Sequence, residues 1–401
     1  MADIKVAIIA PPWLALPIKG YGGIELVIEG LVRGLKEQGV SVEIFANGAR
    51  TMKGVKTHSL YKTEQFSEIH KPYYDSASIV QAHLQFSLNA IRKDGTFDII
   101  HDHNTLIGPQ FLAMATQLPG IPPALHTFHG PPFSTQQSLD QGIPNNRLQL
   151  EQMQDMGKMY MVAISEAMSN TAPKEIKPHL LSAVHNAIRL SDFPFVAHKK
   201  DYFITLARFN PDKGQHIAVK LAVKLNKRLR MAGTIAGIGS NRKLLLELAN
   251  PLSPYRPNHE FRYYSDKILP SVLRYRKISY AGNLSGSRKI NFISQAKALL
   301  FPIDWEEPFG MAVIEALACG TPVIAMNRGA MPEIVEHGVT GFLANSEKEF
   351  EEYMQRIDEI DPAACRRSVE EKFSSVTMAS SYIDRYHEVI KLSKRGHSTK
   401  K

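Results

Sequence analysis

Cysteine is scarce in this sequence, and that scarcity excludes a disulfide framework. The 401 residues include only Cys319 and Cys365, so a reducing compartment is the simplest interpretation. No apolar run approaches the ~20 residues that cross a bilayer as a helix. The apolar stretch Val6–Ala10 is short and runs directly into Pro11 and Pro12, which favours a buried strand over the core of a signal peptide. We therefore expect a cytoplasmic protein.

Acidic residues are outnumbered, but the basic excess is local. The chain has 48 Lys and Arg against 39 Asp and Glu, a formal net charge of +9. Residues 1–200 are nearly balanced, and the segment Lys391–Lys401 holds five basic residues and no acidic one. Such a tail could keep a disordered end in solution, which we favour, or make weak peripheral contact with anionic lipid at the inner membrane face. We expect no nucleic-acid partner, because no basic segment is interleaved with aromatic residues.

The pattern of the chain predicts an α/β protein with two domains. Short apolar runs alternate with helical periodicity from end to end, which favours parallel sheets flanked by helices. The expected strands are Lys5–Ala10, Val42–Ala46, Ile99–Asp102, Ala124–Phe128, Met159–Ser165, Ser182–His185, Tyr202–Ala207, Arg230–Ala236, Ile278–Gly282, Ala298–Pro302, Pro322–Met326 and Gly341–Ala344. Expected helices include Ile24–Gln38, Asn146–Gly157 and Val376–Ser393. Each half then forms its own doubly wound, Rossmann-like unit.

The expected domain boundaries follow from an interruption in this pattern. The stretch Arg189–Asp201 contains Pro194 and has no clear periodicity, so we place the join there. The first domain is then 1–190, the second 191–375, and the segment 376–401 carries a helix followed by the basic tail.

The most informative stretch covers residues 306–322 and reads EEPFGMAVIEALACGTP. It places two carboxylates, Glu307 and Glu315, eight positions apart, on either side of a Pro, a Gly and the start of a helical pattern. One carboxylate at the mouth of a helix and one inside it can face a single ligand at two depths.

The residues between the two carboxylates suit a ligand rich in oxygen. Pro308 favours a helix start, and Gly310 lets a ligand approach the backbone closely. The N–H groups of Gly310, Met311 and Ala312 would then have no intrahelical acceptor and would carry the positive end of the helix dipole. A phosphate or a sugar hydroxyl is therefore a suitable partner.

This pattern resembles the E-x7-E signature of retaining glycosyltransferases of family 4, which have the GT-B fold. The resemblance continues through residues 327–342, NRGAMPEIVEHGVTGF. It implies that Glu307 binds hydroxyls of the transferred sugar, that Glu315 binds the ribose, and that nearby amides bind sugar and phosphate. The donor-binding residues of this segment are then Phe309, Gly310, Met311 and Glu315.

Two further segments are similar to elements of this family. Arg208 and Lys213 flank a strand-to-helix turn and look like the R-x4-K-G element, where two cations offset the charge of a departing diphosphate. Gly22 and Gly23 precede a helix and resemble the family's G-G loop, whose amides approach the donor. The alternative for the glycines is a plain tight turn, and for the two cations ordinary surface solvation.

Histidines gather at the ends of two expected strands. The spacings His101-x-His103 and His126-x-x-His129 could suggest a metal site. Strand residues alternate in direction, however, and no carboxylate or thiolate set completes a shell, so we expect no metal. His129 matches the strand-end histidine that, in the family, contacts the transferred sugar near its reacting carbon, and His103 and Asn104 would line the same cleft. We expect His126 to pack in the sheet.

The resemblance implies a retaining, metal-independent hexosyltransferase without a cofactor. Its second domain would hold the donor, and the C-terminal helix of 376–401 would cross back to the first domain. The enzyme would use a nucleotide diphosphate sugar and an unidentified acceptor, a glycan, a lipid or a small molecule, that binds the first domain near loops such as 131–145. Catalysis would involve His129, Glu307, Arg208 and Lys213 once the cleft closes. Two alternatives remain, namely a sugar-nucleotide epimerase or hydrolase of the same fold and a non-catalytic sugar-nucleotide binder. Residues 251–275, rich in Pro and Tyr, match nothing in the family.

Overall fold

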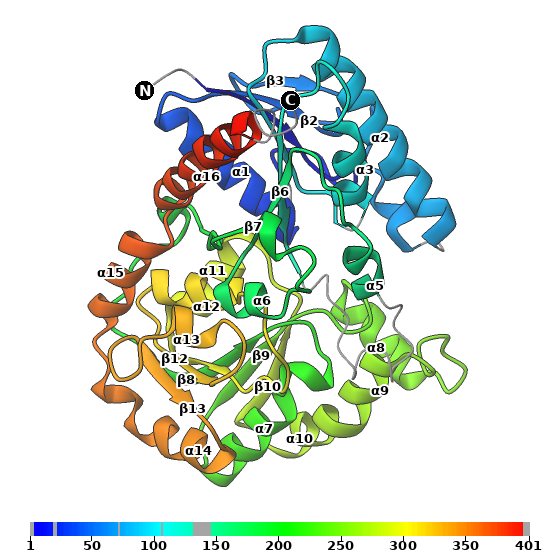
Figure 1. Ribbon diagram of the computed structural model, residues 1–401. Coiled ribbons are helices and arrows are strands. Elements are labelled where there is room, and N and C mark those ends of the chain that lie inside the picture. The colour runs from blue at the N-terminus through cyan, green and yellow to red at the C-terminus, as the bar shows by residue number, and fades with distance from the viewer. Residues whose placement is uncertain (1–3, 19–21, 71–72, 106, 131–145, 396–401) are drawn as a thin grey trace. The chain divides into compact units, whose positions relative to one another are not determined.

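The chain forms two compact α/β units in a computed structural model that describes residues 4–18, 22–70, 73–105, 107–130 and 146–395. Contacts between residues assign Met1–Ile188 and Ser375–Lys401 to unit 1, and Arg189–Ser374 to unit 2 (Figure 1). Each unit is built on its own parallel sheet.

The described residues of unit 1 form a seven-stranded sheet in the order β3-β2-β1-β4-β5-β6-β7. The strands are β1 (Lys5–Ile9), β2 (Ser41–Phe45), β3 (Lys56–His58), β4 (Ile99–Asp102), β5 (Ala124–Phe128), β6 (Met159–Ala163) and β7 (Leu180–Leu181). The helices are α1 (Gly23–Glu37), α2 (Tyr73–Asp94), α3 (Ile107–Ala115), α5 (Asn146–Glu151), α6 (Glu166–Asn170) and α16 (Ser375–Arg395). β4 and β5 are buried along their whole length, as expected for central strands covered on both faces.

The C-terminal helix α16 packs against α1, the first helix of the chain, and Figure 1 shows the two ribbons side by side. Gly34 on α1 permits this approach, because a Cβ atom there would lie 2.3 Å from the backbone oxygen of Ser375. Tyr382 and Tyr386 of α16 are almost completely buried. Helix α16 therefore contributes side chains to the core of unit 1.

Two predicted elements of unit 1 differ from the structure, and one strand was not predicted. β3 was not predicted, since Lys-Thr-His carries no apolar signal for an edge strand. β7 pairs with β6 only at Leu180 and Leu181, not over Ser182–His185. The helix predicted over Asn146–Gly157 ends at Glu151, and further along the Asp155 carboxylate accepts the N–H of Gly157, a local turn that competes with helix.

Unit 2 holds a six-stranded sheet in the order β10-β9-β8-β11-β12-β13. The strands are β8 (Lys200–Leu206), β9 (Leu229–Ala232), β10 (Ile278–Gly282), β11 (Ala296–Phe301), β12 (Val323–Met326) and β13 (Gly341–Ala344). The helices are α7 (Gln215–Lys224), α8 (Asn241–Ala249), α9 (His259–Tyr263), α10 (Leu269–Arg274), α11 (Gly286–Ser294), α12 (Met311–Ala318), α13 (Met331–Ile334), α14 (Glu347–Arg356) and α15 (Pro362–Lys372). The chain runs from β8 outward to β10 and then returns to β11 on the other side of β8. The carboxyl ends of β8 and β11 therefore form the topological switch point of this sheet, where ligands bind in open α/β folds.

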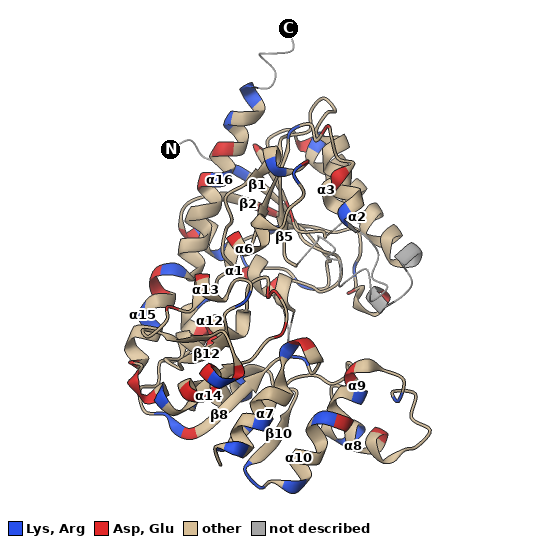
Figure 2. Cartoon of the chain, turned by 60° about the horizontal axis from the view of Figure 1, so that its bottom comes forward, with Lys and Arg blue, Asp and Glu red and all other residues tan. Residues whose placement is uncertain are grey.

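Charged residues are mixed along the outer helices of unit 2, as Figure 2 shows for α14 and α15. Lys220 and Lys224 of α7 each form a 2.6 Å ion pair with a glutamate of α14. In unit 1, α16 extends through Lys391, Lys394 and Arg395, so part of the basic tail is helical. Within the described ranges, no helix combines the length and the apolar character that a membrane span requires.

Candidate active site

Loops that follow three neighbouring strands meet at the switch point of unit 2. The N–H of Asp304, after β11, donates to the backbone oxygen of Asp212, after β8, at 2.8 Å. The N–H of Ala330, after β12, donates to the backbone oxygen of Glu307, after β11, at 2.9 Å. These backbone bonds hold the three loops in fixed register.

The side chain of Glu307 is held by two partners at this junction. Its Oε2 atom accepts from Nζ of Lys213 at 2.5 Å and from the indole N–H of Trp305 at 2.8 Å. Nζ of Lys213 also lies 4.5 Å from the centre of the Trp305 ring, which is cation–π distance. The Lys213 and Glu307 side chains are 16% and 11% exposed, so the ion pair is largely removed from water.

Lys213 is positioned by the sequence Asn-Pro-Asp-Lys-Gly. The Asn210 side chain accepts the N–H of Lys213 at 3.0 Å, and Pro211 opens the short turn Pro211–Lys213. Gly214 closes the turn with φ +65°, and a Cβ atom there would lie 1.7 Å from the backbone oxygen of Pro302. Only glycine fits this close approach between the β8 and β11 loops.

Arg208 occupies a more open position than Lys213. Its side chain is 61% exposed, and its Nε atom lies 3.1 Å from a carboxylate oxygen of Glu260. An exposed pair of this kind contributes little to stability, so the guanidinium could exchange its partner for a phosphate at little cost.

Helix α12 begins at Met311, three residues later than Pro308 suggests. The chain turns into the helix at Gly310, whose φ of +105° favours glycine. Among the described residues, no hydrogen-bond acceptor faces the N–H groups of Gly310, Met311 or Ala312. The first turn of α12 therefore has N–H groups free to bind a ligand. The sequence predicted these free groups, although it placed the helix start at Pro308.

The other two residues of this segment lie deeper. The side chain of Phe309 is 2% exposed and packs against Phe373, with ring centres 6.0 Å apart, and its contact with the donor stays a prediction. Glu315 is 4% exposed, and its Oε1 atom accepts from Nζ of Lys289 in α11 at 2.6 Å. A lysine thus fixes the carboxylate expected to bind ribose.

In unit 1, His129 follows β5 and forms a pair with His103, which follows β4. Nε2 of His129 lies 2.7 Å from Nδ1 of His103, and the ring of His129 is half-buried. Desolvation, with a smaller contribution from His126, lowers the pKa of His129 to about 3. Its ring is therefore neutral near pH 7. The side chain of His103 is fully buried, and the expectation that it lines the cleft with Asn104 stays a prediction.

The remaining strand-end histidines have structural partners. His101 bonds to the hydroxyls of Tyr386 on α16 and Thr127 on β5, at 2.7 and 2.8 Å. His126 packs in the sheet as predicted, 2.6 Å from the Asp102 carboxylate. No group of three His, Cys, Asp or Glu side chains suited to a metal ion occurs in the part of the chain that the structure describes.

The predicted glycine loop is accounted for by packing. Gly22 is buried at the start of α1, and a Cβ atom there would come within 3 Å of the side chains of Ile18, Leu14 and Glu25. Gly23 is the first residue of α1 and is half-buried. The rest of that loop, residues 19–21, and the expected acceptor loop 131–145 lie outside the described residues.

Comparison with models of known families shows to which family the chain belongs. Residues 21–192 match the model of Glycosyltransferase Family 4, and residues 189–368 match that of Glycosyl transferases group 1. The chain belongs to glycosyltransferase family 4. The N-acetyl-alpha-D-glucosaminyl L-malate synthase of Bacillus anthracis is 22% identical over 94% of this chain and 96% of its own. A D-inositol 3-phosphate glycosyltransferase of Paenarthrobacter aurescens is 24% identical over 81% of both chains.

Solved structures show the GT-B fold of this glycosyltransferase. Sucrose-phosphate synthase from Thermosynechococcus elongatus superposes with a TM-score of 0.70 at 18% identity, over 97% of this chain and all of the other. The Anabaena protein HepE, solved in complex with UDP and glucose, gives a TM-score of 0.63 at 16% identity over 96% and 99% of the two chains. Two Rossmann-like domains are therefore established for this family 4 enzyme.

Two residues of this glycosyltransferase's candidate site were missed from sequence. Trp305 belongs to none of the motifs named above, although it stands two positions before Glu307, a spacing that puts side chains on the same side of an extended segment. Lys289 is 26 residues from Glu315 and belongs to no motif, so only the packing of α11 against α12 reveals it.

Proposed function

We propose that this glycosyltransferase moves a hexose from a nucleotide diphosphate sugar to its acceptor with retention of configuration and without a metal ion. The observation that carries the proposal is the meeting of three loops at the switch point of unit 2. Together they present two cations, two carboxylates and a helix mouth with unused N–H groups. Complexes of the structural neighbour HepE with UDP and with UDP-glucose support a nucleotide-sugar donor.

The leaving diphosphate would be stabilised by fixed positive charge. Arg208 and Lys213 supply two cations, and the N–H groups of Met311 and Ala312 supply the positive end of a helix dipole. These groups are held before the donor arrives, so they need little reorganisation as charge develops on the diphosphate oxygen. This arrangement makes a metal ion unnecessary for charge neutralisation.

The two carboxylates would act at different parts of the donor. Glu307 would face the sugar, where positive charge grows on the ring as the bond to the diphosphate breaks. Glu315, held by Lys289, would accept from the ribose hydroxyls, which do not change during the reaction. His129 would meet the sugar as a neutral hydrogen-bonding group.

A panel of nucleotide sugars, tested without acceptor, examines this proposal. Each is added at 100 times its dissociation constant, where a true donor stabilises the fold by about 2.7 kcal/mol, and the products are followed by NMR. Slow release of free sugar as the α anomer from an α-linked donor is the expected result. An altered but intact nucleotide sugar would indicate an epimerase, and binding without turnover would indicate a non-catalytic binder.

A further inference from the structure

Unit 1 contains a pocket that is separate from the group of residues described above at the switch point of unit 2. Its volume is about 160 Å³, and its walls come from the segments after β1 and β4 and from helices α1, α2 and α3. β1 and β4 are neighbours at the topological switch point of this sheet, because the chain runs from β1 outward to β3 and then returns to β4. The pocket therefore lies where an open α/β sheet binds ligands.

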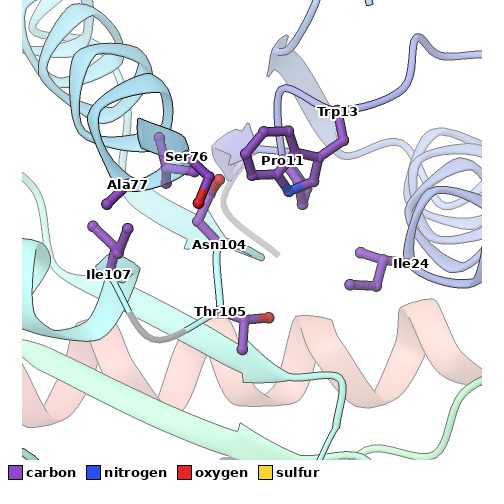
Figure 3. Close-up of a pocket in the computed structure, with 9 residues that line it drawn as sticks. Pro11, Trp13, Ile24, Ser76, Ala77, Asn104, Thr105 and Ile107 are labelled. Atoms are coloured by element: carbon purple, nitrogen blue, oxygen red, sulfur yellow. The ribbon is translucent and has the colours of Figure 1, made fainter. Parts of the chain in front are cut away.

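The lining of the pocket is mostly apolar and carries no charged side chain. Figure 3 shows Trp13 and Ile24 on one side, Ala77 and Ile107 on the other, and Asn104 between them. None of the nine lining residues is acidic or basic: Pro11, Trp13, Ile24, Ser76, Ala77, Val80, Asn104, Thr105 and Ile107. A cavity of about 150 Å³ with apolar walls is large enough for benzene.

One polar atom in this pocket has a defined hydrogen-bonding need. Asn104 is 2% exposed, and its Nδ2 donates to the Asp102 carboxylate at 2.8 Å and to the backbone oxygen of Ile9 at 3.3 Å. These two bonds fix the amide orientation, and Oδ1 has no donor among the described residues. A buried acceptor of this kind favours a ligand that brings an O–H or N–H group.

The pocket also lies beside the histidine pair of the same unit. Asn104 directly follows His103, whose Nδ1 is 2.7 Å from Nε2 of His129. The polar end of the pocket is thus formed by the residue after His103, which is the partner of the histidine that the proposed function places at the transferred sugar. A group that enters here and bonds to Asn104 therefore contacts the residue next in the chain to His103.

We propose that this pocket binds the acceptor, and that the acceptor presents a neutral apolar ring bearing a hydroxyl group, such as a phenol. This inference rests on the proposed function for its identification of the ligand as the acceptor. In the transfer, the acceptor oxygen would bond to the anomeric carbon, the bond from that carbon to the diphosphate would break, and the hydroxyl proton would leave with the diphosphate. An anionic acceptor would find no counter-charge among the lining residues.

Binding of small probes to Trp13 tests the pocket without any donor. The chain has two tryptophans, so a Trp305→Phe variant reports Trp13 fluorescence alone. We expect phenol to bind about tenfold more tightly than toluene, the value of one hydrogen bond to a buried acceptor, and benzoate to bind at least tenfold more weakly than phenol. Tighter binding of benzoate or glucose than of phenol, or no response to any probe, would overturn the proposal.

Matched variants on one helix separate the pocket from a general effect on the fold. Ala77→Leu adds three carbons inside the pocket and should abolish phenol binding, whereas Ala82→Leu adds them at an exposed position of α2 and should not. If Ala77→Leu does not fold, Ile107→Ala provides the second test, since the enlarged pocket should prefer naphthol to phenol. An unchanged preference would contradict the assignment.

Activity assays keep this proposal apart from the proposed function. Hydrolysis of the donor alone needs no acceptor and should be unaffected by Ala77→Leu, whereas transfer to a phenol should be lost. Donor hydrolysis without any binding at Trp13 would refute the acceptor pocket and leave the proposed function standing. Phenol binding without turnover of any nucleotide sugar would refute the proposed function.

Discussion

Removing one partner of the ion pair between Lys213 and Glu307 should reduce both stability and activity, and removing the second partner as well should cost no further stability and restore no activity. The two side chains are 16% and 11% exposed, so either single variant leaves a charge that water reaches poorly. Breaking a buried pair costs about 3–5 kcal/mol. Because some exposure remains, and because Trp305 still bonds to Glu307 when the lysine is lost, we expect about 2–3 kcal/mol for Lys213→Met or Glu307→Gln.

The double variant separates the structural role of the pair from its chemical role. With both charges gone, no unpaired charge remains, so the loss should not exceed that of either single variant, which corresponds to a coupling energy of about 2 kcal/mol. Activity should not recover, because both the cation for the diphosphate and the carboxylate for the sugar are absent. Urea unfolding of the four proteins measures the first effect, and kcat for donor hydrolysis measures the second.

A pair on the outer surface of unit 2 provides the matched control. The Lys220–Glu347 pair has a similar distance, 2.6 Å against 2.5 Å, but its side chains are 65% and 43% exposed. The substitutions Lys220→Met and Glu347→Gln should couple by less than about 1 kcal/mol and leave kcat unchanged. Additive losses at Lys213 and Glu307, or recovery of kcat in their double variant, would refute the reasoning.

Four further results follow from the same structure. Arg208→Ala should leave the urea midpoint unchanged, because the side chain is 61% exposed. The same variant should lower kcat/KM by an amount that corresponds to about 2–4 kcal/mol of lost transition-state stabilisation, and a normal kcat/KM would place the diphosphate elsewhere. Glu315→Ala should raise the donor KM with kcat largely retained, and Lys289→Met should do so to a smaller degree; loss of kcat alone in steady-state kinetics would reverse the roles of the two carboxylates. The pKa of His129 is about 3 against an ordinary 6.5, so only the unfolded chain binds this proton as the pH falls below about 6.5. The free energy of unfolding in urea should therefore be lower at pH 5 than at pH 7.5, and it should depend less on pH in His129→Asn. Chelation with EDTA should leave donor hydrolysis intact, and a complete loss that added metal reverses would contradict the cationic clamp.

The buried glutamate of α1 has a pKa that is set by its packing and not by a sequence motif. Glu25 is 5% exposed, and burial, opposed by a backbone hydrogen bond, raises the pKa of its carboxyl. The carboxylate also lies where a Cβ atom on Gly22 would meet it. The Gly-Gly-Ile-Glu segment is therefore constrained by its own packing, whether or not a donor contacts it.

Local sequence determined those features that depend on neighbours along the chain. Buried parallel strands read as short apolar runs, so nearly every strand of both sheets could be located, with ends shifted by one or a few residues. The turn that carries Lys213 is fixed by Asn210, Pro211 and Gly214, and each acts through its own backbone preference. The two carboxylates could be proposed from their spacing around Gly310, because a helix start and its unused N–H groups are local properties.

Tertiary structure decided every feature in which distant segments meet. The lysine that holds Glu315, the tyrosines of α16 that bond within the sheet of unit 1, and the burial of the Phe309 ring all involve partners far away in the sequence. The same is true of the pocket at Asn104, whose walls come from five separate segments. Periodicity along a chain shows which face of an element is buried, but the residue that covers this face is chosen by the packing of whole helices against whole sheets. The cations and carboxylates of this glycosyltransferase could therefore be named from sequence, whereas their partners and the acceptor pocket could not.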